Sequence, residues 1–320
     1  MLPCARVRRL RRIAGGSEPF GLRLAAPAEL CDAARMLTGA CLCGALRYEV
    51  EGPLRNLTHC HCSMCRKHHG APFASLVEAA LSSFRWSSGE ASVSEYASSA
   101  TRVRAFCEIC GSVAPTQVGE RVSIPAGNLL GELGAVSGRH VFVGSKAPWH
   151  VIADELPQYD SAPPDSVSPD GAAPALVRPA LPSLQGATHG SCLCGDVSFS
   201  VSGAPARWLQ CHCSRCRRGR SAAHGSNTFY PIAQFAWRTG REWVRKYKLP
   251  EAERFMVSFC ARCGGGAPVE RDNVPFVLVP ASLLDADPGM RPQGHIFVAS
   301  KAPWYTIRDA LPRFAELPPP

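Results

Sequence analysis

The chain has 320 residues, of which 46% are hydrophobic and 19% charged, and its formal net charge is +9. This composition is typical of a globular protein with room for two domains, and it excludes a disordered chain. No apolar run reaches the roughly 18 residues that a membrane-spanning helix needs, and the N-terminus lacks the apolar block of a secretory signal, so we expect a soluble, cytoplasmic protein.

Residues 1–37 are predicted to be a basic leader that does not belong to the folded domains. Its first 35 residues contain seven Arg, no Lys and three acidic residues. An Arg-rich segment is typical of an organelle transit peptide, but the acidic residues count against that interpretation. Nothing in the leader has a counterpart later in the chain, so we expect it to be disordered, or translation to begin at Met36.

After the leader, the chain contains the same domain twice. GACLCGALRYEVEG at 39–52 matches GSCLCGDVSFSVSG at 190–203, and VFVGSKAPWHVI at 141–152 matches IFVASKAPWYTI at 296–307. The offset grows only from 151 to 155 residues, which indicates a tandem duplication. We therefore predict a first copy at 38–160 and a second copy at 188–320.

Within each copy the local patterns favour short strands. ALRYEV, VSFSV, RVRAF and RFMVSF alternate in polarity, and Gly, Pro, Asn and Ser separate them. Only SMCRKHHG and SLLDAD are expected to form a turn or two of helix. The prediction is a mainly β fold of small antiparallel sheets.

Between the copies, residues 161–187 are rich in Pro, Ala and Ser and are predicted to be an extended linker. Charge is distributed unevenly on its two sides. Residues 36–160 carry 10 basic and 11 acidic side chains, a net charge of −1, whereas residues 186–320 carry 17 and 10, a net charge of +7. The basic second copy indicates either an ordinary solvated surface or attraction of an anionic ligand or nucleic acid.

Fourteen of the sixteen cysteines belong to the two copies, seven in each; Cys4 and Cys31 lie in the leader. An odd number excludes a complete disulfide framework within one copy, so metal binding is the better interpretation. In each copy, CxC and CxxC motifs supply four thiolates, the ligand set of a closed structural zinc site. The predicted ligands are Cys41, Cys43, Cys107 and Cys110 in the first copy, and Cys192, Cys194, Cys260 and Cys263 in the second.

The remaining three cysteines of each copy form the motifs CHCSMC and CHCSRC. They are Cys60, Cys62 and Cys65, and Cys211, Cys213 and Cys216. A zinc ion with three protein ligands keeps a fourth position for water or substrate, which is the arrangement of a catalytic site. His61 or His212 is an alternative fourth ligand, although a residue between two such ligands faces away from them. Reduced cysteines without metal are a further alternative.

Basic residues follow directly after each three-cysteine motif. Zinc with three thiolates carries a charge of −1, and a fourth thiolate from a ligand raises this to −2, which requires cations or hydrogen-bond donors nearby. Arg66, Lys67, Arg217 and Arg218 could supply them or hold the carboxylates of an acidic thiol. Ordinary surface charge is the alternative interpretation.

With GxCxCG, CHCxxCR, CxxCG and the SKAPW segment in this order, each copy resembles the family of glutathione-dependent formaldehyde-activating enzymes and centromere protein V. The resemblance implies a zinc-dependent β-tent fold with one structural and one catalytic zinc per copy, the three-cysteine motifs being catalytic. It also implies S-(hydroxymethyl)glutathione synthase activity, a carbon–sulfur lyase in reverse, with glutathione as co-substrate. The partners would be a small-molecule thiol and an aldehyde, and no membrane.

No general base is evident from the motifs, and the two copies differ beside them. His68, His69, His150 and His224 are candidates, but CRKHHGAPF in the first copy is replaced by CRRGRSAAH in the second. The second copy therefore acts on another thiol adduct or binds metal without turnover. The alternative for the whole chain is a non-catalytic zinc module that carries thiols or binds protein or, in the basic second copy, nucleic acid.

Overall fold

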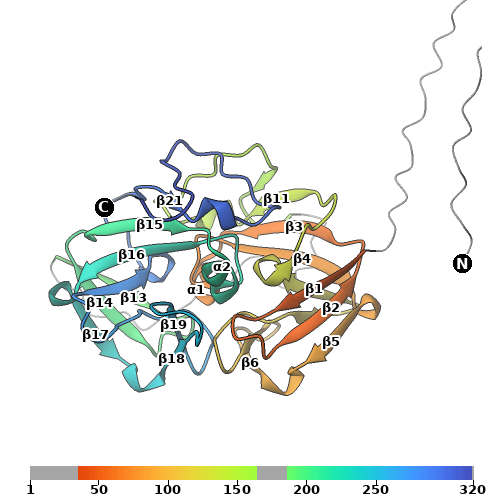
Figure 1. The fold of residues 1–320 in the computed structure, drawn as a ribbon, viewed down its shortest axis with the longest axis horizontal. Coiled ribbons are helices and arrows are strands. Elements are labelled where there is room, and N and C mark those ends of the chain that lie inside the picture. The colour runs from red at the N-terminus through yellow and green to blue at the C-terminus, as the bar shows by residue number, and fades with distance from the viewer. Residues whose placement is uncertain (1–34, 164–185, 319–320) are drawn as a thin grey trace, which may run out of the picture. The chain divides into compact units, whose positions relative to one another are not determined.

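The computed structural model describes residues 35–163 and 186–318 (Figure 1). Both predicted copies lie within one compact unit, Ala34–Pro320. Most of the predicted leader at 1–37 and of the predicted linker at 161–187 lies outside the described residues, as do Cys4 and Cys31.

The first copy consists of short strands and one α-helix, α1 (Ser63–His69). Its strands are β1 (Met36–Ala40), β2 (Arg47–Glu51), β3 (Arg55–Cys60), β4 (Ala74–Ala80), β5 (Phe84–Ser88), β6 (Val93–Ala97), β7 (Val103–Cys107), β8 (Thr116–Val118), β9 (Arg121–Pro125), β10 (Leu129–Leu130), β11 (Gly138–Val141) and β12 (Gln158–Tyr159). One-turn 3₁₀-helices connect some of them: Leu81–Ser83, Glu90–Ser92, Ala126–Asn128 and Val143–Ser145.

The second copy repeats this order around α2 (Ser214–Arg220). Its strands are β13 (Ala187–Ser191), β14 (Ser198–Ser202), β15 (Arg207–Cys211), β16 (Gly225–Pro231), β17 (Phe235–Thr239), β18 (Val244–Lys248), β19 (Met256–Cys260), β20 (Phe276–Pro280) and β21 (His295–Ile296). Its 3₁₀-helices are Ile232–Gln234, Arg241–Trp243, Ala281–Leu283 and Val298–Ser300. SMCRKHHG forms α1 as predicted, whereas SLLDAD contributes only to the 3₁₀-helix Ala281–Leu283.

The described residues confirm the predicted fold class: they form a mainly β structure of several small sheets with two α-helices. The first copy has sheets ordered β10-β1-β2-β5, β12-β11-β3-β4-β9-β8 and β6-β7, and the second has β13-β14-β17, β20-β16-β15-β21 and β18-β19. Neighbours are antiparallel, except that β11 runs parallel to β3 and β12, and β21 runs parallel to β15. The three-cysteine motifs therefore begin at the ends of interior strands, β3 and β15.

Alternating polarity explains which face of each strand is buried. In β2, Tyr48 and Val50 are buried while the strand's two ends are exposed, as the period-two pattern of ALRYEV predicts. These two side chains pack with Val77 and Ile124 in the main core of the first copy. Phe199 and Val201 of β14 occupy the matching place in the second copy.

The two copies pack against one another through α1 and α2, which lie next to each other in Figure 1. α1 contacts the 3₁₀-helix Ala281–Leu283 of the second copy, and α2 contacts the 3₁₀-helix Ala126–Asn128 of the first. His69 Nδ1 lies 3.0 Å from the carbonyl oxygen of Arg220, and Ser221 Oγ donates to the carbonyl oxygen of Val113 at 3.2 Å. Each copy therefore supports the helix that carries the other copy's third cysteine.

The glycine after each CxxC motif lies in this contact. Gly111 and Gly264 have φ values of +72° and +67°, a conformation that favours glycine. A Cβ atom on Gly111 would lie 2.4 Å from the Phe259 ring, and one on Gly264 would lie 2.3 Å from the Phe106 ring. The motif glycines thus permit both the turn and the close approach of the two copies.

Candidate metal centres

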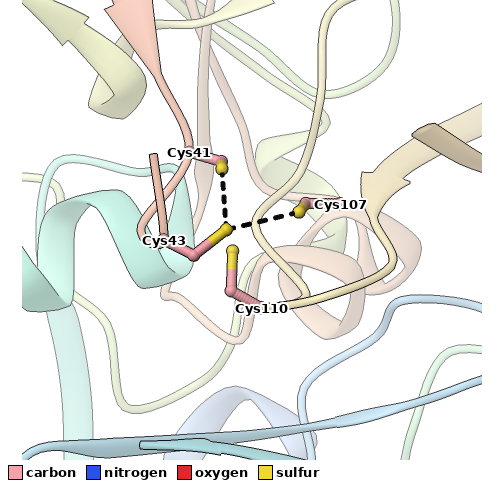
Figure 2. Close-up of side chains that lie close together, drawn as sticks. All are labelled: Cys41, Cys43, Cys107 and Cys110. Atoms are coloured by element: carbon pink, nitrogen blue, oxygen red, sulfur yellow. Dashed lines mark hydrogen bonds between the residues drawn. The ribbon is translucent and has the colours of Figure 1, made fainter. Parts of the chain in front are cut away.

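The first four-cysteine site consists of Cys41, Cys43, Cys107 and Cys110, whose sulfur atoms converge between two loops (Figure 2). All four sulfurs lie within 4.8 Å of one another, with Cys41–Cys43 at 3.3 Å and Cys43–Cys107 at 3.7 Å. Zinc–sulfur bonds of about 2.3 Å in a tetrahedron place sulfurs about 3.8 Å apart. This donor set therefore fits a closed zinc site.

The second four-cysteine site, formed by Cys192, Cys194, Cys260 and Cys263, repeats this geometry. The sulfur of Cys194 lies 3.4 Å from that of Cys192 and 3.8 Å from that of Cys260. In both sites the CxC pair comes from the loop after the first strand and the CxxC pair from the turn after a hairpin strand, β7 or β19. The sulfurs are brought together although about 65 residues separate the two motifs.

The closeness of the four thiols in each site explains why the site suits a metal cation. Hydrogen bonds from Cys107, Cys41 and Cys43 lower the pKa of the Cys110 thiol, whereas hydrogen bonding to Cys110 raises the pKa of Cys107. Thiolates this close repel one another, so protons must remain on some of the sulfurs unless a metal cation replaces them. The cysteine clusters are thus compatible with zinc binding.

The first three-cysteine site is formed by Cys60, Cys62 and Cys65, whose sulfurs also lie within 4.8 Å of one another. Cys60 ends β3, Cys62 is the N-cap of α1, and Cys65 lies in the helix. The Cys65 amide donates to the Cys62 sulfur at 3.4 Å, which satisfies a free amide of the first helical turn. The helix start thus fixes the position of two of the three thiols.

The second three-cysteine site, formed by Cys211, Cys213 and Cys216, has the same construction. Cys213 is the N-cap of α2 and accepts from the Cys216 amide at 3.3 Å, and its sulfur lies 3.6 Å from that of Cys211. No fourth His, Cys, Asp or Glu of the described residues joins either three-cysteine cluster. Each donor set therefore suits a zinc ion that keeps one position for another ligand.

The histidine inside each motif bonds to other partners. His61 Nε2 lies 2.8 Å from His140 Nδ1, and His140 Nε2 lies 3.0 Å from Asp154. In the second copy, His212, His295 and Asp309 form the same chain of hydrogen bonds. Each chain of hydrogen bonds holds the backbone between two thiols. Burial lowers the pKa of His61 to about 3, so its ring is neutral.

The first three-cysteine site opens into a cavity of about 430 Å³, here called the first-copy cavity. Thiols, histidines and arginines line it, among them Cys60, Cys62, Cys65, His68, His69, Arg102, Arg104, Arg121 and Arg139. The Arg104 Nη1 atom lies 3.8 Å from the Cys65 sulfur. Burial opposes the charge of this guanidinium, but the thiolates of Cys65 and Cys62 outweigh it and raise the pKa of Arg104.

A second cavity, of about 340 Å³, lies between the copies. Phe73, Trp149 and His150 of the first copy and His224 and Tyr305 of the second line it. Of the four histidines considered as general bases, His68 and His69 therefore line the first-copy cavity, whereas His150 and His224 line this second cavity.

Comparison with known proteins identifies the family. A family model described as "Glutathione-dependent formaldehyde-activating enzyme" (GFA) matches residues 36–145 and 187–300. The chain belongs to the GFA family. Its two matched regions are two tandem GFA copies, and the family's description names glutathione and formaldehyde, both small molecules.

Two further comparisons complete this result. No curated protein matches the chain significantly. A crystal structure of a Rhodobacter sphaeroides protein is similar at 25% sequence identity and a TM-score of 0.25, covering 32% of this chain and 97% of that one.

Among the described residues, no helix is both long and apolar enough to cross a membrane.

Arg66 and Lys67 were predicted to bind an acidic thiol at the first three-cysteine site, and Arg217 and Arg218 at the second; Arg66 and Lys67 are not among the residues that line the first-copy cavity. Lys67 Nζ bonds to Asp285 at 2.6 Å and to oxygens of Ser191 and Leu283, and Arg218 donates to the carbonyl oxygen of Leu42 at 2.7 Å. Both residues thus join the two GFA copies. Arg66 donates to the carbonyl oxygens of His61 and Ser145, while the Nε atom of Arg217 makes no hydrogen bond within the described residues.

Two sets of residues beside the sites were missed from the sequence. Arg102, Arg104, Arg121 and Arg139 reach the first-copy cavity from distant strands, and no local motif marks them. The paired His140–Asp154 and His295–Asp309 had a signal, because the same 14-residue spacing recurs in both GFA copies.

Proposed function

We propose that the first copy catalyses the addition of glutathione to formaldehyde to give S-(hydroxymethyl)glutathione, and the reverse carbon–sulfur cleavage. The observation that carries this proposal is a three-thiol donor set that opens into a 430 Å³ cavity, in a chain of the GFA family. Pockets of roughly 300–1,000 Å³ are typical of small-molecule sites.

The addition of glutathione to formaldehyde needs no further co-reactant. A carbon–sulfur bond forms between the glutathione sulfur and the aldehyde carbon, the carbonyl π bond breaks, and the thiol proton ends on the carbonyl oxygen. Cys60, Cys62 and Cys65 would hold zinc, which when bound supplies a Lewis acid that lowers the pKa of a thiol at its open position. Arg104, beside Cys65, would offset the negative charge of the thiolates.

His69 is the candidate to carry the proton in the first copy. Its Nδ1 lies 3.0 Å and 3.1 Å from the carbonyl oxygens of Arg220 and Ser221, which only accept hydrogen bonds. Nδ1 therefore holds the ring proton, and Nε2 is left with a lone pair that can accept one. Burial lowers the pKa of His69, so the ring is in the neutral form that this role needs.

The test is the rate of adduct formation from glutathione and formaldehyde, followed by NMR. Because this addition proceeds without a catalyst, the rate in buffer alone is the reference. We expect the zinc-loaded chain to exceed this rate and Cys62→Ser to return to it, since the variant lacks one of the three ligands. Equal rates for wild type, variant and buffer would contradict the proposal.

Zinc content of each preparation serves as the control, because loss of the ion and loss of folding must be separated from loss of chemistry. A fully zinc-loaded chain without acceleration would support the alternative of a non-catalytic zinc module. Binding of DNA by the second copy with a steep dependence on salt concentration would then identify it as a nucleic-acid binder.

A further inference from the structure

The second cavity, of about 340 Å³ between the copies, is separate from the cysteine sites. None of the fourteen cysteines of the two copies lines it, and its walls include the segments that follow β11 and β21 (Figure 1). Both copies contribute residues at equivalent positions. Phe73 and His224 follow α1 and α2, and His150 and Tyr305 follow the two SKAPW segments. Each copy therefore supplies part of one common cavity.

A continuous cluster of aromatic rings lines the second cavity. The ring centroid of Phe73 lies 5.2 Å from that of His150 and 5.7 Å from that of His224. Tyr305 lies 6.1 Å from Phe73, and Trp149 lies 6.2 Å from His150. Rings at such distances, about 4.5–7 Å, attract one another through their edges and faces. An aromatic ligand can make the same contacts, so the cavity suits a planar ring.

The surroundings of this cluster favour an uncharged ligand. Burial lowers the pKa of His224 to about 3 and holds the pKa of His150 well below its usual value, so both rings are neutral. A charged ligand would lose its hydration there as an imidazolium does. Two arginines also line the cavity, but both are exposed, and Arg291 binds Asp287 through both of its terminal nitrogens, leaving Arg308 as the other.

The lining also contains hydrogen-bond acceptors that lack donors. Gln210 is 5% exposed, and its Oε1 atom makes no hydrogen bond within the described residues. The Asp154 and Asp309 carboxylates each accept from one histidine and one backbone amide, although a carboxylate has about four acceptor positions. A buried acceptor without a donor is unfavourable, so the cavity suits a ligand that donates a hydrogen bond.

We infer that the second cavity is a binding site for one neutral aromatic molecule that donates a hydrogen bond, such as a phenol. The ring packs on the aromatic cluster, and the hydroxyl group donates to Gln210 Oε1. The volume lies near the lower end of the roughly 300–1,000 Å³ typical of small-molecule sites, which fits a ligand of one ring. The inference does not depend on the proposed reaction, because no thiol lines this cavity.

The test is titration of the zinc-loaded full chain with 4-fluorophenol, followed by ¹⁹F NMR. We expect one binding site per chain, because the two copies build a single cavity. Two analogues keep the ring: 4-fluoroanisole lacks the hydroxyl proton, and 4-fluorobenzoate carries a negative charge. Each should bind at least about tenfold more weakly, since the first leaves the acceptor unpaired and the second buries a charge. Absence of 4-fluorophenol binding, equal affinity for 4-fluoroanisole, or tighter binding of 4-fluorobenzoate would overturn the inference.

Gln210→Leu tests the hydrogen bond. The substitution keeps a side chain of similar size but removes Oε1, so the affinity for 4-fluorophenol should fall to that for 4-fluoroanisole. The matched control is His59→Leu at the equivalent position of the first copy. His59 pairs with His140 as Gln210 pairs with His295, but His59 is not among the lining residues. An unchanged preference for 4-fluorophenol in Gln210→Leu would contradict the inference.

Ala153→Trp tests the place of binding without altering a buried residue. Ala153 is exposed and lines the cavity, so a Trp ring at this position should cover its opening and abolish binding of 4-fluorophenol. Glu155→Trp is the control, because Glu155 is also exposed but does not line the cavity. A phenol could instead bind zinc at a three-cysteine site. Binding that survives Ala153→Trp, or that is lost equally in both variants, would therefore overturn the inference.

Discussion

At the scale of single residues, Arg104 is the cation that contacts the first three-cysteine site directly. It is held by a hydrogen bond from its Nε to Ser98 Oγ at 3.0 Å, and its charge faces the Cys65 thiol. A metal with three thiolates is a net anion, so a fixed guanidinium stabilises the metal-bound state more than the empty one. The second copy has Val257 at this position.

We predict that Arg104→Met weakens zinc retention at the first three-cysteine site about tenfold, the usual effect of losing a partner of a metal ligand. Competition with a chromophoric chelator measures this retention. Val257→Met is the matched control, because it places the same side chain at the equivalent position without removing a charge. If the Arg104 variant and the wild type retained zinc equally well, the arginine would not stabilise the bound ion.

At the scale of secondary-structure elements, α1 and α2 each join the copy that they do not belong to. The Lys67 ammonium of α1 is buried and bonds to oxygens of Ser191, Leu283 and Asp285 in the second copy. Loss of the ammonium would leave the buried acceptor oxygens without a donor. The free energy of unfolding then falls by more than the hydrogen bond itself contributes. Asp285 is partly exposed and can regain water, so the carbonyl oxygens bear most of the cost.

Lys67→Met should therefore lower the free energy of unfolding by about 2 kcal/mol or more, the range for hydrogen bonds to charged groups. Denaturant titration of the zinc-loaded chain measures the change. Arg66→Met is the control, because the hydrogen bonds that the neighbouring Arg66 donates to His61 and Ser145 lie within the first copy. If both variants lost the same stability, the contact between the copies would not depend on Lys67.

At the scale of the whole molecule, the four cysteine clusters predict four zinc ions per chain. The four-thiolate sites are closed, whereas the three-thiolate sites keep one coordination position accessible. The two kinds of site should therefore differ in how easily a chelator removes their zinc. We expect metal analysis to find about four zinc ions and a chelator to remove two of them before the far-ultraviolet circular dichroism changes. Two ions per chain, or loss of structure from the first ion onward, would contradict this division.

The sequence predicted the cysteine sites well because their ligands come in short motifs. CxC and CxxC are local patterns, and a duplicated chain supplies each pattern twice, so both clusters and the mainly β fold followed from spacing and alternation. The cavity arginines could not be found this way, since their side chains meet only after β7, β9 and β11 are placed. The bonds that Lys67 and Arg218 make to the other copy could not be predicted either, because contacts between copies leave no sequence pattern.

The reciprocal contact of α1 and α2 has a consequence for how such a chain can diverge. In an assembly of identical subunits, every substitution appears on both sides of the contact, so neither site can change alone. Covalent fusion removes that constraint while keeping partners together at any dilution. One copy can then keep its original binding site while the site of the other copy accumulates substitutions. The helix of each copy remains supported by contacts with the other copy.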